Sequence, residues 1–287
     1  MKLPNSFFRD RSLWGLAACA FLFSSADSMA QHYVHGTSAT LSNNATGVIR
    51  LRNSASEFRN FAAATTNIIN TGVFDVQGNL SGVAFTDGSG NPAGATALGF
   101  NALMRVPGMV RYSSGSAQTV QGRWYNNLDL TNAGQKDYLA TTVYVSGTYT
   151  VAGGSREYGT STFIYDGSNA QTITAENGTS GNTNRYYNLN LQNAGAKTVA
   201  AATEVRVSEA FTMEASNTAT LTINGTMRTE NTATQAAGAG SIAVDGASAS
   251  LNLGNGASTF SATNNVALNN GGTVNTSTCA ATFSGAS

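Results

Sequence analysis

The chain has 287 residues, and its 15 basic and 15 acidic side chains give a formal net charge of zero. Only 10% of the residues are charged, against about 25% in ordinary globular proteins, and Ser, Thr, Asn, Ala and Gly take their place. The sequence has no basic cluster that would attract nucleic acid and no acidic run typical of a disordered tail. We therefore expect a folded protein that does not bind nucleic acid.

The first thirty residues have the pattern of a secretory signal peptide. Arg9 and Arg11 make the start basic, Leu13–Phe23 is an apolar run, and the small residues Ser28 and Ala30 favour cleavage after position 30. A membrane-spanning helix needs ~20 apolar residues, so this run is too short to cross a bilayer. The pattern predicts a signal peptide at 1–30, no transmembrane segment, and a mature chain secreted to the extracellular side or outer surface of a Gram-negative cell.

Cys19 offers an alternative to cleavage after position 30, in which the chain is a lipid-anchored surface protein. The stretch Leu16–Cys19 resembles the bacterial lipobox, whose cysteine carries a lipid anchor, but the apolar run continues after Cys19 where a lipoprotein has a polar linker. Signal cleavage would leave Cys279 as the one cysteine, which excludes an internal disulfide. Cys279 is then a candidate for an intermolecular contact.

Short segments of alternating apolar and polar residues recur along the rest of the chain, which is the period of a half-buried strand. Gly, Asn, Asp and Ser fall between them and mark turns. Strand starts about 8–12 residues apart predict an all-β sandwich, barrel or solenoid. The clearest segments are Val48–Arg52, Val73–Val76, Leu128–Leu130, Val143–Val145, Val205–Val207, Leu221–Ile223, Ile242–Val244 and Leu251–Leu253. We expect helical or irregular structure at Ser54–Ala64 and, more weakly, at Gly94–Arg105.

An internal repeat favours the solenoid. Trp124–Lys136 and Arg185–Lys197 share eight of thirteen aligned residues, and looser similarity extends the units to about 112–151 and 165–213, with an insertion in Glu176–Arg185. The identical pairs are Tyr125/Tyr186, Asn127/Asn188, Leu128/Leu189, Leu130/Leu191, Asn132/Asn193, Ala133/Ala194, Gly134/Gly195 and Lys136/Lys197. A unit of about 55–60 residues suits two or three stacked coils, whereas an immunoglobulin-like array needs about 100 residues per domain.

The predicted fold is therefore a right-handed parallel β-helix or β-solenoid of short strands over 109–287, after a less regular capping β section at 31–108; a β-sandwich array is the alternative. In such a stack Leu128 and Leu130 point inward with their counterparts Leu189 and Leu191. Asn127 and Asn132 are expected to stack on equivalent amides of the next coil. The recurring tyrosines, Tyr112, Tyr125, Tyr165 and Tyr186, either fill the core or form an aromatic strip for sugars.

The repeat also carries a resemblance. The pattern Y-x-G-x-A-Q-T-[VI], followed by Y-x-N-L-x-L-x-N-A-G-x-K-T and V-x-V-x-G-x-[YF]-T, lies in 112–151 and 165–213. It resembles the β-strand repeats of large secreted surface proteins of the Bacteroidota–Chlorobi group. The resemblance implies an adhesin-like protein or a component of the cell surface or matrix.

The residues do not indicate an enzyme. The only histidines, His32 and His35, lie at the expected new N-terminus, so no Ser-His-Asp set is predicted. Candidate carboxylates are scattered over strands and turns: Asp129, Asp137, Glu157, Asp166 and Glu176. We expect no catalytic residue, no cofactor and no metal site.

The C-terminal part points to assembly. No charged residue and no proline follows Asp245, and such residues normally protect an exposed sheet edge. We expect a secreted structural or adhesive protein that assembles end to end into filaments or a surface layer. Its partners would be further copies, surface or matrix components, or glycans. The alternative is a polysaccharide-binding or polysaccharide-cleaving β-helix.

Overall fold

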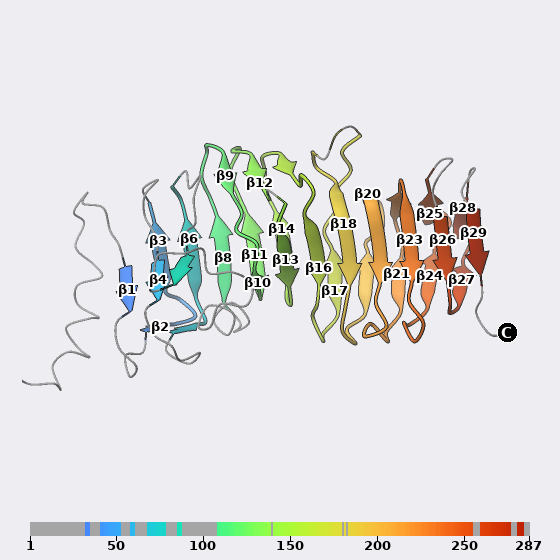
Figure 1. Ribbon diagram of the computed structural model, residues 1–287, viewed down its shortest axis with the longest axis horizontal. Helices are drawn as coiled ribbons and strands as arrows, with labels where there is room; N and C mark the ends of the chain where they lie inside the picture. Colours follow the sequence, from blue (N-terminus) through green and yellow to red (C-terminus); the bar gives the residue numbers. More distant parts are fainter. Residues whose placement is uncertain are drawn as a thin grey trace, which may run out of the picture.

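The computed structural model describes residues 32–34, 41–52, 58–60, 68–78, 85–87, 108–138, 140–179, 181, 183–254, 259–276 and 280–283. All regular structure within these ranges is β-strand, and every pair of neighbouring strands is parallel. The strands stack along one long axis (Figure 1). The predicted all-β parallel solenoid is thereby confirmed. No helix in the part of the chain described is long and apolar enough to cross a membrane.

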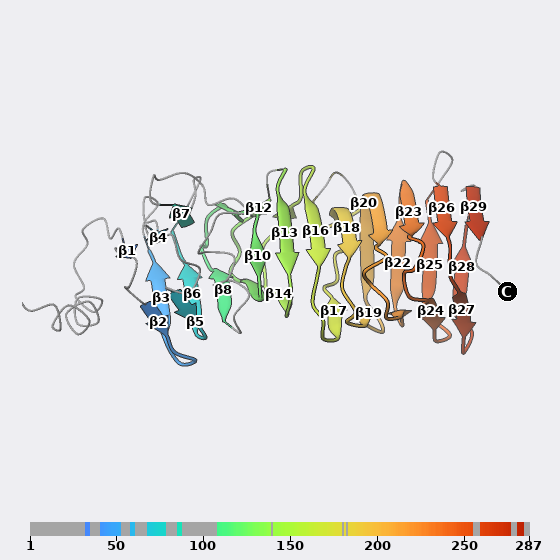
Figure 2. The ribbon, with the colours of Figure 1, turned by 60° about the horizontal axis from the view of Figure 1, so that its bottom comes forward.

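The strands form ladders on the sides of the stack, and the turned view shows them crossing its long axis (Figure 2). A five-stranded sheet contains β3 (Val48–Leu51), β6 (Val73–Val76), β8 (Met109–Tyr112), β11 (Asn127–Leu130) and β14 (Tyr149–Val151). Three small sheets contain β1 (His32–Val34), β4 (Phe58–Asn60) and β7 (Phe85–Asp87); β2 (Leu41–Asn43) and β5 (Ile68–Asn70); and β9 (Gln118–Thr119), β12 (Lys136–Asp137) and β15 (Arg156–Glu157).

The two remaining sheets extend from β10 to the C-terminal end of the described stack. The eleven-stranded sheet contains β10 (Trp124–Tyr125), β13 (Thr142–Val145), β16 (Thr162–Tyr165), β18 (Tyr186–Leu191), β20 (Glu204–Met213), β22 (Thr226–Thr229), β23 (Thr232–Gln235), β25 (Ser250–Leu253), β26 (Thr259–Ala262), β28 (Thr273–Asn275) and β29 (Ala280–Phe283). The last sheet, which we call the β17 sheet, contains β17 (Gln171–Ile173), β19 (Lys197–Val199), β21 (Leu221–Ile223), β24 (Ile242–Asp245) and β27 (Val266–Asn269). The long strand β20 pairs with both β22 and β23, so the ladder divides there into two sides of the coil.

A continuous core follows from the parallel register. Side chains one coil apart stack in columns: Tyr165 lies between Val145 and Leu191, and Met213 follows Leu191. All four are fully buried. Each such side chain contributes about 1.5–3 kcal/mol through burial, and each coil needs its neighbours to cover it.

The helical or irregular structure predicted for Ser54–Ala64 is wrong at the residues that the structure describes there. Within Ser54–Ala64, the segment Phe58–Asn60 is strand β4, which pairs with β1 and β7. Flanking coils offer hydrogen-bond partners on both sides, and this pairing overrides a weak local helix preference. The remainder of that segment and Gly94–Arg105 lie outside the described residues. The five-stranded ladder itself runs across position 108, since β6 pairs with β8.

The two repeat units occupy different sides of the stack. Leu128 of the first unit lies on β11 of the five-stranded sheet, whereas its counterpart Leu189 lies on β18 of the eleven-stranded sheet. In register, Leu189 stands between Phe163 and Phe211, so it does not share a column with Leu128. The second unit is therefore displaced by one face around the axis.

This displacement leaves two strands at the edges of their sheets. Strands β14 and β15 are the last of the five-stranded sheet and of the small sheet with β9 and β12. The insertion of the second unit pairs with β15. The amide of Asn184 donates to the carbonyl of Arg156 at 2.7 Å, and Thr183 forms an antiparallel bridge with Glu157.

Candidate functional site

The repeated leucines contribute to the core and to no surface site. Leu128, Leu130, Leu189 and Leu191 are all fully buried. The prediction that they point inward is confirmed. Their place among the repeated residues thus reflects packing between coils, and a functional site must be sought elsewhere.

The repeated asparagines at the Asn-Ala-Gly turns build the corners of the coil. Asn132 and Asn193 adopt left-handed backbone conformations, with φ of 66° and 60°. The side-chain amide of Asn132 donates to the carbonyl of Ser113, and that of Asn193 donates to the carbonyl of Asp166 at 2.5 Å. The expected stacking of asparagine on asparagine is wrong, because these amides bond to the main chain of the preceding coil instead.

The other repeated asparagines lie on strands and likewise bond to different residues. Asn127 Oδ1 accepts from the main-chain amide of Thr148 at 2.9 Å and from its hydroxyl at 2.8 Å. The side-chain amide of Asn188 donates to Thr162 Oγ1 at 3.3 Å. Since Asn127 and Asn188 belong to different sheets, the stacking predicted for Asn127 is wrong as well.

The repeated lysines lie inside the stack, which the sequence did not indicate. Lys136 and Lys197 are fully buried. The Lys136 ammonium donates to the carbonyls of Ser114 and Gly134, both at 3.0 Å, and that of Lys197 donates to the carbonyls of Gly167 and Gly195, both at 2.9 Å. Each ammonium thus joins the turn of its own coil to the turn of the preceding one.

Burial changes the ionisation of these lysines. Desolvation lowers the pKa of Lys136 below its ordinary value, and it lowers the pKa of Lys197 to about 8 although the Asp166 carboxylate opposes the shift. The unfolded chain keeps the ordinary lysine pKa near 10.5. Between these two values the unfolded state binds a proton that the folded state has released. The free energy of unfolding must therefore rise with pH across that window.

We expect stability to rise from pH 8 to about pH 10 and to fall above it. The fall follows because burial raises the pKa of the core tyrosines, that of Tyr165 to about 12, so above pH 10 the unfolded state loses protons that the folded state keeps. Urea denaturation across pH 7–11 measures both limbs. Lys197→Met should reduce the rising limb and leave the falling limb; an unchanged rise would contradict this role of Lys197.

The recurring tyrosines belong to the core, and the sugar strip considered for them is not formed. Tyr112, Tyr125, Tyr165 and Tyr186 are fully buried. The hydroxyls of Tyr112 and Tyr125 lie 3.1 Å apart, and those of Tyr165 and Tyr186 lie 3.0 Å apart. Each pair also bonds to the main chain, as when Tyr125 donates to the Gln121 carbonyl at 2.6 Å.

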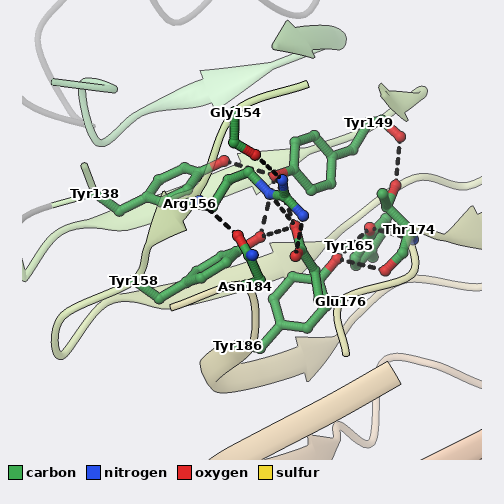
Figure 3. A network of polar contacts seen from close by, with 10 residues as sticks. All are labelled: Tyr138, Tyr149, Gly154, Arg156, Tyr158, Tyr165, Thr174, Glu176, Asn184 and Tyr186. Carbon is green, nitrogen blue, oxygen red and sulfur yellow. Dashed lines mark hydrogen bonds and ion pairs between the residues drawn. The ribbon is translucent and has the colours of Figure 1, made fainter. Parts of the chain in front are cut away.

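A buried ion pair lies where the stack changes face (Figure 3). The Arg156 guanidinium meets the Glu176 carboxylate through two bonds, Nη2 to Oε2 at 2.7 Å and Nε to Oε1 at 3.0 Å. The Glu176 side chain is fully buried and that of Arg156 is 12% exposed. Burial alone would lower the pKa of Arg156, but the bonds to Glu176 outweigh it and hold that pKa above its ordinary value. The Arg156 guanidinium therefore stays charged inside the protein.

Tyrosine hydroxyls complete this network (Figure 3). Tyr158 donates to Glu176 Oε1 at 2.8 Å, the hydroxyls of Tyr149 and Tyr158 lie 3.0 Å apart, and those of Tyr138 and Tyr149 lie 2.9 Å apart. Burial raises the pKa of all three tyrosines, and the nearby Glu176 carboxylate adds to the shift. They remain neutral donors at physiological pH. Arg156 of β15, Tyr149 of β14 and Tyr158 all bond to the Glu176 carboxylate, so the network ties the start of the insertion to the edge strands β14 and β15. In the sequence, this network is signalled by the insertion in Glu176–Arg185, which interrupts the repeat.

The other candidate carboxylates are separated and bonded. Asp129 accepts from Arg111 at 2.7 Å and from Thr150 at 2.6 Å, on a register column in which Arg and Asp alternate. Glu157 accepts from Thr183 at 2.6 Å. Among the residues described, no three His, Cys, Asp or Glu side chains gather closely enough to hold a metal ion. His35 and Cys279 lie outside the described residues, and of His32 only its place in β1 is described.

The C-terminal end of the described stack exposes core positions. Leu268 of β27 continues the column of Ile223 and Val244, which are fully buried, yet Leu268 is 55% exposed. In the described residues β27, β28 and β29 each have a neighbouring strand on one side only. Their other edges present main-chain donors and acceptors. We call β27, β28 and β29 together the terminal rung.

Among the residues described, no further strand pairs with the outer side of the terminal rung, which lies at one end of the rod (Figure 1). Comparison of the chain with protein-family models, with curated proteins and with solved structures finds no match.

Proposed function

We propose that this chain is a secreted cell-surface structural or adhesive protein, and that it assembles end to end through the terminal rung. The observation that carries the proposal is Leu268, a core-column residue that is 55% exposed where its predecessors are fully buried. Burying such a leucine contributes about 1.5–3 kcal/mol. Pairing the strand edges adds main-chain hydrogen bonds to this gain.

The occupant that we propose for the rung is a second copy of the chain. The rung contains no charged side chain, since the last one in the sequence is Asp245. Two identical uncharged rungs can therefore meet without repulsion, and their strand edges would bond to each other. A contact between the same surface on both copies has two-fold symmetry, which makes the strands antiparallel across the junction.

The two ends of the stack differ. Leu51, a core position of the first strand of the five-stranded sheet, is fully buried, in contrast to Leu268. This favours a junction between two terminal rungs, with rods of double length as the product. A head-to-tail filament would instead require an open first coil.

Electron microscopy of purified residues 31–287 over a concentration series tests the assembly, and light scattering gives the mass. We expect double-length rods at high concentration. Leu268→Lys places a charge against its own copy in the junction and should give single rods, at little cost to folding because the side chain is already exposed. Thr172→Lys, on an exposed outward position of β17, is the control and should still assemble. Single rods of the unmodified chain at every concentration would contradict the proposal. Filaments would support assembly but contradict the two-fold junction, because they require a head-to-tail contact.

A further inference from the structure

An aromatic strip lies on the outer face of the eleven-stranded sheet. Trp124, Tyr144 and Ile164 stand in register on β10, β13 and β16. The residues that follow them, Tyr125, Val145 and Tyr165, are fully buried in the core, so alternation places the strip on the opposite face.

The strip contains two partly exposed aromatic rings and one buried aliphatic side chain. The Trp124 and Tyr144 rings have centroids 4.9 Å apart and an interplanar angle of 55°. Both residues are partly exposed, and Ile164 beside them is 4% exposed. In the same column the later coils carry Asn190, Thr212 and Thr234. Large apolar side chains at this outer position are thus confined to three adjacent coils.

A polar depression of about 300 Å³ adjoins the strip. It is lined by Asn126, Ser146, Asp166, Ser168, Asn169 and Asn193. Asn126, Ser146 and Asp166 directly follow β10, β13 and β16, two positions beyond Trp124, Tyr144 and Ile164. The parallel ladder continues to them, because the main-chain amides of Ser146 and Asp166 donate to the carbonyls of Tyr125 and Val145, and this spacing keeps the three residues on the outer face. Their arrangement is held by hydrogen bonds, with Ser146 Oγ donating to Asp166 Oδ1 at 2.8 Å.

The lining determines what the depression can bind. Amides, hydroxyls and a single carboxylate supply donors and acceptors, and no Lys or Arg lines it to attract an anion. A calcium ion takes six to eight oxygen ligands, commonly with several carboxylates, so one Asp is a poor match. A pyranose ring has an apolar C–H face that stacks on aromatic rings and a rim of hydroxyls that both donate and accept. The volume is at the lower end of that of small-ligand pockets, which suits a single ring.

We propose that Trp124 and Tyr144, with the adjoining depression, form a binding site for a neutral polysaccharide. A pyranose unit stacks on the exposed part of the rings and directs its hydroxyls to Asn126, Ser146 and Asn169. This site would give the adhesive part of the proposed function its target, and in that respect it rests on the proposed function. It does not require the terminal rung.

Affinity electrophoresis of the full chain tests the site, in gels containing laminarin, galactomannan or xylan, with polygalacturonate as the acidic comparison. At least one neutral polysaccharide should retard the protein, with no effect of a chelator, and polygalacturonate should not. Tyr144→Ala should weaken that retardation about tenfold, since ring stacking is lost. Asn169→Ala, at an exposed position, should weaken it several-fold without changing the melting temperature.

The controls separate this proposal from the assembly. Tyr144→Phe retains the ring and should bind like the unmodified chain, and so should Tyr187→Ala, which removes a partly buried tyrosine outside the site. Leu268→Lys should bind equally well per molecule, even as single rods. No retardation by any of the neutral polysaccharides, or equal retardation of folded Tyr144→Ala, would overturn the site while leaving the assembly untouched.

Discussion

Replacing Glu176 with Gln should lower the free energy of unfolding by about 3 kcal/mol or more, because it leaves the buried Arg156 guanidinium without its counter-charge. Gln has nearly the same shape, so the loss reports the charge rather than the packing. The carboxylate also accepts from Tyr158 at 2.8 Å, and a charged acceptor makes this bond stronger than an amide would. Urea denaturation at pH 7 measures the change.

A partly exposed ion pair provides the control. Glu204 Oε1 lies 2.9 Å from Arg206 Nε, but the Glu204 side chain is 27% exposed, and such pairs contribute about 1 kcal/mol or less. Glu204→Gln should therefore change stability little. The double substitution Arg156→Met with Glu176→Leu should cost less than Glu176→Gln alone, since it leaves no unpaired buried charge. Equal small losses of unfolding free energy for Glu176→Gln and Glu204→Gln would show that the buried Arg156–Glu176 pair does not stabilise the fold.

Gly134→Ala should destabilise the stack by at least about 3 kcal/mol, the upper end of the cost of overpacking. A methyl group on Gly134 would lie 2.0 Å from the carbonyl oxygen of Ser116 and 2.7 Å from that of Ser114, both main-chain atoms of the preceding coil. Neither can move without breaking the coil spacing. Gly195→Ala should cost a similar amount, because its methyl would lie 2.0 Å from the carbonyl oxygen of Asn169.

Gly115 gives the control within the same corner. A methyl group there would meet no atom within 4 Å, so Gly115→Ala should be neutral or stabilise by about 0.4–1 kcal/mol through the unfolded chain. Thermal unfolding followed by circular dichroism compares the three variants. A melting temperature of Gly134→Ala equal to that of Gly115→Ala would contradict the close approach of the coils.

Much of the fold follows from local pattern. Alternation alone placed Leu128 and Leu189 in the core, because side chains on a strand point to opposite faces in turn, but it could not show that they lie on different sheets. The duplicated segment, with its Asn-Ala-Gly turn, indicated stacked coils. The prediction for Phe58–Asn60 was wrong, since no local feature records the flanking strands that pair with it. The burial of Lys197 was equally hidden, because the carbonyls that bind it come from two different coils.

The sequence by itself determined that this chain forms short strands in a repeated coil, because both signals lie within a few tens of residues. Only the tertiary structure decided which coils lie in register. One coil runs from Met109 to Asn127 and another from Thr162 to Asn188, so the number of residues per coil varies and register cannot be counted along the chain. Register is fixed by hydrogen bonds and core contacts between coils, and it is register that places Trp124 beside Tyr144.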